Sequence, residues 1–186
     1  EIDHVSSLGE LISTSGLARA KPVFVRPAVH TFNCDASAVT VTAKGHGVRC
    51  LADSDELQIV STLGSYRHGV VQCSININAL GEGLFIGVGK EDCRKSKLGM
   101  RGTKFLGWFG DTGNANYCVG SSNKLGQPWA RNVTIVLRLD ADRHTLTGIH
   151  GSRIETIPVP ATALCFVALM FMDSEITFQG GSSLWL

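Results

Sequence analysis

The sequence lacks the features that would place a protein across a membrane or export it. Its longest apolar stretch, "ALCFVALMFM" from Ala163 to Met172, is too short to cross a bilayer as a helix and is typical of a buried strand. No basic region followed by an apolar one appears after Glu1, so no secretory signal is expected. We expect a processed chain or a piece of a longer protein, intracellular, with the cytoplasm as the simplest compartment.

The sequence also lacks paired cysteines. Its cysteines show neither a C-x-x-C pair nor the Cys/His spacing of a metal site, and they are Cys34, Cys50, Cys73, Cys93, Cys118 and Cys165. A chain of 186 residues buries enough surface to be stable without disulfide bonds. We therefore expect mostly buried free thiols in a reducing compartment, no metal and no cofactor.

No motif of a known catalytic or nucleotide-binding loop is present. The glycine-rich run before Lys90 fails as a P-loop, because Leu84 stands where its first glycine is required and Glu91 follows the lysine. No strand carries the alternating carboxylates of a sandwich-fold glycosidase, and the pattern G-x-S-x-G does not occur. The histidines are dispersed along the chain. We therefore expect a protein that is not an enzyme and has no small-molecule substrate.

What the sequence does contain is a series of strand signals with little helix. Alternating or continuous apolar runs end in glycine-rich turns, and they span residues 37–43, 57–63, 70–77, 83–89, 105–108, 133–140, 145–150, 164–171 and 174–179. Only Leu8 to Ala20 could form a short helix, and its Ser, Thr and Gly content disfavours one. Strands at this spacing predict an all-β fold, an antiparallel β-sandwich or barrel.

Charge is unevenly distributed along the chain. The segment from Lys90 to Lys104 holds six basic residues against Glu91 and Asp92, which gives it a charge of +4 in a chain whose net charge is +1. The rest of the chain therefore carries a mild negative charge, and this segment is a basic loop on an acidic body. Such a loop is either a solvated connection or a site for an acidic ligand.

The order of the elements resembles that of a SPRY (B30.2-like) domain. The resemblance covers roughly residues 37–179 and depends on successive stretches, namely "ELQIVSTLGSYRHGVVQCSININ" from Glu56, "GLFIGVGKED" from Gly83, "FLGWFGDTGNANYCVGS" from Phe105, "LGQPWA" from Leu125 and "VTIVLRLDADRHTLTGIHGSRI" from Val133. It implies a concanavalin-like sandwich of two bent antiparallel sheets over residues 37–186. Residues 1–36 would then be an N-terminal extension that packs on the sandwich.

In function, the resemblance implies a non-enzymatic module that binds peptides or protein surfaces through loops at one end of the sandwich. We expect an adaptor or scaffold within a larger protein, and we expect its partner to be an acidic protein or peptide. The partner-binding residues expected from the resemblance and the charge pattern are Tyr66, Arg67, His68, Arg94, Lys95, Lys97, Leu98, Arg101 and Lys104.

Two other kinds of ligand remain open on the sequence. The basic loop 90–104 could bind nucleic acid such as RNA, although it lacks interleaved aromatic residues for base stacking. A lectin-like sandwich could bind carbohydrate on an aromatic platform of Trp108 with Asp111, Asn114 and Asn116. The simpler interpretation of Trp108 is a core anchor between the sheets, with a turn from Gly110 to Asn116 after it.

Overall fold

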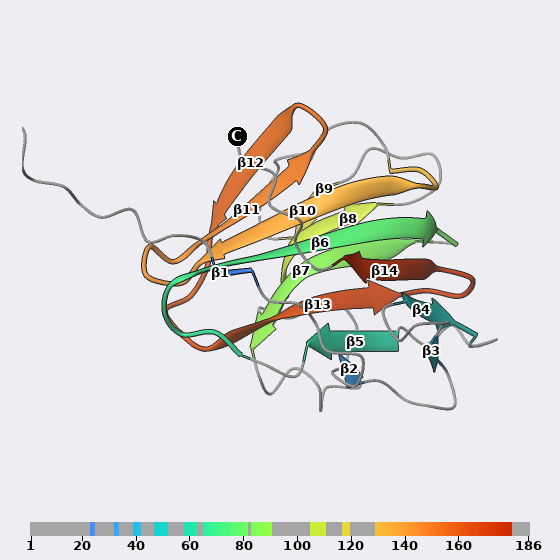
Figure 1. Ribbon diagram of the computed structural model, residues 1–186, viewed down its shortest axis with the longest axis horizontal. Helices are drawn as coiled ribbons and strands as arrows, with labels where there is room; N and C mark the ends of the chain where they lie inside the picture. Colours follow the sequence, from blue (N-terminus) through green and yellow to red (C-terminus); the bar gives the residue numbers. More distant parts are fainter. Residues whose placement is uncertain are drawn as a thin grey trace, which may run out of the picture.

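The computed structural model describes ten stretches of the chain, all in strands and the turns between them. These stretches are residues 23–24, 32–33, 39–41, 47–51, 58–62, 65–81, 83–90, 105–110, 117–119 and 129–179. They form fourteen β-strands arranged in two sheets that lie over one another (Figure 1). Within these stretches no helix is long and apolar enough to cross a membrane.

The larger sheet is built around β6, the longest strand. From one edge to the other its strands are β12 (Arg153–Pro158), β11 (Thr145–His150), β10 (Val133–Asp140), β6 (Val70–Ala79), β14 (Glu175–Gln179), β4 (Gly47–Cys50) and β3 (Val39–Val41). These strands pair antiparallel, whereas the short β1 (Val23–Phe24) lies parallel to the start of β6.

The second sheet has six strands, all antiparallel. In order they are β2 (Phe32–Asn33), β5 (Gln58–Thr62), β13 (Leu164–Met170), β7 (Leu84–Lys90), β8 (Phe105–Gly110) and β9 (Tyr117–Val119). Both β1 and β2 come from the expected N-terminal extension, and each joins a different sheet. The boundary at residue 36 stays a prediction, because residues 1–22 lie outside the described residues.

The main core lies between the inner faces of the two sheets. Alternate residues of β6 point inward, and their side chains are buried: Val71, Cys73, Ile75 and Ile77. They belong to one cluster with large side chains of the other sheet, among them Trp108 and Phe166. Because side chains on a strand alternate between faces, the intervening positions of β6 carry Gln, Ser and Asn.

The six-stranded sheet is buried on its other face as well. A second apolar cluster there comprises Phe85, Phe105, Phe109, Cys165, Val167 and Leu169. Aromatic rings pack edge-on in it, with 6.2 Å between the ring centroids of Phe85 and Phe105 and 5.9 Å between those of Phe109 and Phe171. Burial on both faces explains why β7 and β13 are continuous apolar runs in the sequence.

The predicted antiparallel all-β sandwich is confirmed, and the bounds predicted for β10 and β11 are those observed. The expectation that Trp108 is a core anchor is also confirmed, since its side chain is fully buried. Three cysteines are buried as reduced thiols, as expected, namely Cys50, Cys73 and Cys165. The other cysteine side chains and the possible helix Leu8–Ala20 lie outside the described residues.

We predict that Trp108→Ala lowers the free energy of unfolding by about 3–5 kcal/mol, because the substitution empties a fully buried aromatic site. Trp108→Phe should cost less, since it keeps a ring and removes an indole Nε1–H that has no hydrogen-bond partner among the described residues. Urea denaturation followed by circular dichroism measures both changes. A nearly neutral Trp108→Ala would contradict the assignment of this ring to the core.

Candidate functional site

One end of the sandwich brings together residues from both sheets. Val70, at the start of β6, lies opposite Asp140, at the end of β10. In the other sheet Lys90, at the end of β7, lies opposite Leu164, at the start of β13. Tyr66 forms an isolated bridge with the same Leu164. We call this region the Tyr66 end; it comprises residues 65–69, Lys90, Leu164 and the turn 140–144.

Tyr66 anchors the loop that precedes β6. Its backbone N–H donates to the carbonyl of Leu164 at 2.8 Å and its carbonyl accepts from the N–H of Leu164 at 3.1 Å. Its ring is half-buried and lies 5.8 Å from the ring of Phe166, centroid to centroid. Burial raises the pKa of the Tyr66 hydroxyl, the thiols of Cys73 and Cys165 raise it further, and a hydrogen bond with Thr62 opposes the shift. The tyrosine therefore attaches the loop to the edge of the core.

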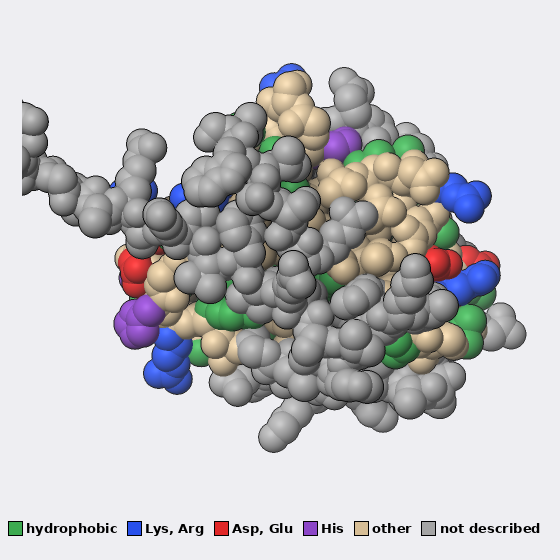
Figure 2. All heavy atoms as spheres, viewed as in Figure 1, with side chains coloured by type: hydrophobic (Ala, Val, Ile, Leu, Met, Phe, Trp, Pro, Cys, Tyr) green, Lys and Arg blue, Asp and Glu red, His purple; other side chains and the backbone are tan. Residues whose placement is uncertain are grey.

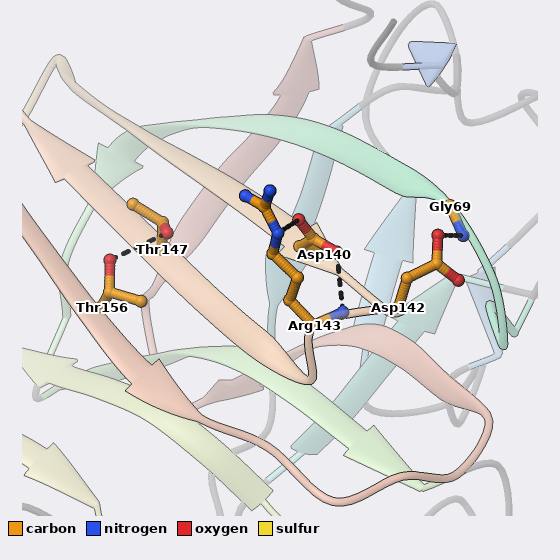
Figure 3. A network of polar contacts seen from close by, with 6 residues as sticks. All are labelled: Gly69, Asp140, Asp142, Arg143, Thr147 and Thr156. Carbon is orange, nitrogen blue, oxygen red and sulfur yellow. Dashed lines mark hydrogen bonds and ion pairs between the residues drawn. The ribbon is translucent and has the colours of Figure 1, made fainter. Parts of the chain in front are cut away.

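The other end of the loop is pinned to the turn between β10 and β11. The N–H of Gly69 donates to Oδ2 of Asp142 at 3.0 Å (Figure 3). The carbonyl of Gly69 accepts from the N–H of Ala141 at 2.9 Å. Gly69 has a φ of 80°, a conformation that other L-residues rarely adopt. The two contacts fix the loop 67–69 against a turn that lies 73 residues away in sequence.

Two predicted site residues stand on this fixed loop with exposed side chains. His68 lies 3.5 Å from Asp142, measured from Nδ1 to Oδ1, and its side chain is 89% exposed. Arg67 is exposed and has no hydrogen bond or ion pair with any described residue. Among the described residues Asp142 is the only polar partner of His68.

The turn after β10 is held by the side chain of Asp140, the last residue of that strand. The carboxylate of Asp140 accepts a hydrogen bond from the N–H of Arg143 at 2.9 Å, and Nε of Arg143 lies 3.9 Å from the same carboxylate (Figure 3). His144 closes the turn with a φ of 55° and its carbonyl accepts from the N–H of Val159 at 2.8 Å. The guanidinium of Arg143 is largely exposed, so it adds a second exposed cation at the Tyr66 end.

The Tyr66 end therefore presents charge on a rigid base. Exposed cationic groups come from Arg67, Lys90 and Arg143, whereas the carboxylates of Asp140 and Asp142 are engaged with backbone N–H groups. Figure 2 shows acidic, histidine and basic side chains gathered at the left end of the molecule, where these loops lie in Figure 1. The arrangement suits recognition of carboxylate or phosphate by exposed guanidinium groups.

The basic half of the predicted site lies outside the described residues, namely Arg94, Lys95, Lys97, Leu98, Arg101 and Lys104. The residues that flank it are described. Lys90 lies opposite Leu164 at the Tyr66 end, and Phe105 lies opposite Gly89 on the neighbouring strand. The chain thus leaves β7 and enters β8 at the same end of the sandwich as Tyr66, so of the predicted residues the structure brings together Tyr66, Arg67 and His68.

The sugar-binding alternative loses its aromatic platform. Trp108 is fully buried between the sheets and cannot stack on a ligand at the surface. Asp111, Asn114 and Asn116 lie outside the described residues. Among the described residues, no group of three or more His, Cys, Asp or Glu side chains could hold a metal ion.

Comparisons with known proteins agree on the architecture. No protein-family model and no curated protein matches the sequence. The crystal structure of the TRIM65 PSpry domain matches with a TM-score of 0.63, 14% sequence identity, and coverage of 81% of this chain and 93% of that one. The fold is that of a SPRY domain. The SPRY domain of human HERC1 also matches, with a TM-score of 0.57, 12% identity, and coverage of 81% of this chain and 99% of that one.

The resemblance to SPRY domains predicted from the sequence is thus confirmed at the level of the fold. Sequence reasoning missed the residues that position the SPRY-like loop 67–69, above all Gly69 and Asp142. The strands predicted over residues 133–140 and 145–150 leave a short turn between them, and the turn is observed. Its contact with residue 69 follows from the register of β10 on β6, which no local pattern encodes.

We predict that Asp142→Ala accelerates hydrogen exchange of the Gly69 amide, because this amide donates to the Asp142 carboxylate. Global stability should change by less than about 1 kcal/mol, since the carboxylate is more than half exposed. Exchange measured by NMR tests both points. Arg143→Ala is the control and should leave the Gly69 amide unchanged; equal exchange in Asp142→Ala and the wild type would contradict the pinned loop.

The fold should lose stability in alkaline solution. Burial raises the pKa of the Cys73 thiol to about 12, and the pKa of Tyr66 is raised as well. The folded state keeps these protons while the unfolded chain releases them, so stability is complete below about pH 9 and falls as the pH rises toward 12. Urea denaturation across this range measures the slope, and Cys73→Ala should make it shallower. An unchanged slope would show that Cys73 does not keep its proton.

Proposed function

We propose that this protein is a non-enzymatic protein-interaction module whose Tyr66 end recognises an acidic segment of a protein partner. The module would serve as an adaptor or scaffold within a larger protein. The observation that carries this proposal is the pinned loop 67–69, which holds Arg67 and His68 in solvent beside the turn that bears Arg143. The resemblance to SPRY domains supports it, because it implies binding through loops at one end of the sandwich.

The anchoring of loop 67–69 favours a role in binding over a role in keeping the protein soluble. A solvated loop needs no anchoring, whereas residues 66 and 69 each exchange two backbone or side-chain hydrogen bonds with another element. A fixed loop loses little conformational entropy when a ligand binds, and its exposed guanidinium can then form bidentate hydrogen bonds with a carboxylate. The half-buried ring of Tyr66 offers an apolar surface beside these charges.

The basic segment extends the proposed site. It begins at Lys90, at the Tyr66 end, and brings Arg94, Lys95, Lys97, Arg101 and Lys104, with Leu98 as an apolar member. Its charge has the same sign as that of Arg67 and Arg143, so an acidic ligand would be attracted by both parts. No described contact favours nucleic acid or carbohydrate over an acidic peptide.

A displayed random-peptide library tests the proposal without knowledge of the natural partner. We predict that the wild-type domain selects peptides enriched in Asp and Glu. Fluorescence anisotropy with a selected peptide should show that Arg67→Glu weakens binding about tenfold and that Arg94→Glu with Lys97→Glu abolishes it, with thermal stability nearly unchanged. Raising the salt concentration should weaken binding modestly.

Arg131→Glu is the matched control, because Arg131 is exposed at the opposite end of β10. This reversal changes the net charge by the same amount as Arg67→Glu and should alter peptide affinity less than about twofold. Selected peptides without acidic enrichment, or equal losses in both variants, would remove the Tyr66 end as the binding site.

A further inference from the structure

Among the described strands, the eight-stranded sheet has one long edge without a partner, which we call the open edge. Among the outermost strands of the two sheets, β2 has two residues, β3 and β9 have three each, and β12 has six. No described strand pairs with the outer side of β12. The β11–β12 hairpin stands at the margin of the sheet (Figure 1), and Figure 2 shows a basic side chain at its tip. Short edges expose little unpaired backbone, so β12 differs from the other three.

The hairpin turn fixes which backbone groups of β12 point to this edge. Gly151 has a φ of 58° and Ser152 does not have a positive φ, which is the pattern of a two-residue type II′ turn between His150 and Arg153. In such a hairpin the flanking pair exchanges hydrogen bonds, and the pairs alternate from there. Arg153, Glu155 and Ile157 therefore bond to β11, whereas the N–H and C=O groups of Ile154 and Thr156 point outward.

Two further observations agree with this assignment. Thr147 and Thr156 form a pair without backbone hydrogen bonds in this register, and their hydroxyl oxygens lie 3.0 Å apart, as expected for such close pairs (Figure 3). Pro158, which has no N–H, falls at an outward position opposite Thr145. The open edge thus offers the backbone of Ile154 and Thr156 and ends at Pro158.

The side chains along this edge do not all protect it from pairing with another strand. Ile154 is 59% exposed, which is the largest exposure among the described large hydrophobic residues. It is flanked by Arg153 and Glu155, which have opposite charges and share the other face of the strand. An exposed aliphatic residue on an open edge is a site where another strand can add.

The sequence Arg153-Ile154-Glu155 is its own complement in an antiparallel pair. When Ile154 lies opposite Ile154 of a second copy, Arg153 of each chain lies opposite Glu155 of the other. The same register pairs the outward backbone groups of Ile154 with each other and those of Thr156 with Ser152. The two neighbouring registers place Glu155 opposite Glu155 or Arg153 opposite Arg153, and like charges in direct opposition are unfavourable.

We propose that two copies of this chain associate through their β12 edges, antiparallel and centred on Ile154, so that the two eight-stranded sheets become continuous. The occupant of the edge is a second copy because charge complementarity selects one register of the strand with itself. The interface is small, so the dimer is weak, with a dissociation constant in roughly the micromolar to millimolar range. This inference is independent of the peptide-binding role proposed above.

Sedimentation velocity over a range of concentrations, with paired charge reversals, tests the proposal. Arg153→Glu and Glu155→Arg should each raise the dissociation constant at least about tenfold, because each places like charges opposite one another. An equimolar mixture of these two variants should associate again, since every charged pair in the mixed dimer is then opposite in sign. Thr156→Pro removes an outward N–H and should weaken association without unfolding the strand.

Arg67→Glu, which lies at the Tyr66 end and not in β12, is the control and should leave self-association unchanged. Circular dichroism of every variant distinguishes lost association from lost folding. A wild-type chain that stays monomeric up to about 1 mM overturns the proposal and leaves the edge to another protein or to solvent. Association that is indifferent to both reversals, or that the mixture fails to restore, overturns it equally.

Discussion

Burial of one apolar layer between two sheets is the constraint on which the rest of this structure depends. The inner positions of β6, such as Ile75 and Ile77, lie in the same cluster as Trp108 and Phe166 of the facing sheet. A slip of one residue would turn this row to solvent and drive Asn76 and Asn78 into the core. Those two amides are instead satisfied on the outer face, where Asn76 donates to Asn78 at 2.7 Å and Asn78 donates to Thr177 at 2.7 Å. Both faces therefore favour the same register.

That register also positions the candidate site. Because Asp140 lies opposite Val70, the turn that follows β10 meets the loop that precedes β6, and Asp142 reaches the N–H of Gly69. In the other sheet the pairing of Leu164 with both Lys90 and Tyr66 brings β7 to the same place. The site is thus assembled by core packing, and its exposed cations can vary without disturbing the residues that hold the loop.

The sequence predicts those parts of the fold that local patterns encode. β10 and β11 alternate cleanly around a polar turn, and β7 and β13 are continuous apolar runs, so all four are predicted. β12 is not, because Ile154 and Ile157 are three residues apart and fall on opposite faces of the strand. An exposed isoleucine between two charges resembles neither a half-buried strand nor a polar loop.

The same limit applies to the site. Tyr66, Arg67 and His68 stand out as a polar turn between two strand signals, and the structure places them on a turn. Asp142 belongs to a different hairpin, and only the pairing of β6 with β10 shows that it holds their loop. Long-range register of this kind depends on the packing of whole sheets, which single-sequence patterns do not contain.

The two proposed surfaces use different interactions and are linked by β11, which follows the turn 140–144 and pairs with β12. At the Tyr66 end, recognition would depend on side-chain charge, which salt screens when the groups are exposed. Along β12 it would depend mainly on backbone hydrogen bonds, which are far less sensitive to salt, with charge selecting the register. Pro158 lies opposite Thr145, close to the turn that carries Arg143, and it ends the open edge there. An added strand would therefore stop before the loops of the Tyr66 end, so one chain could use both surfaces at once.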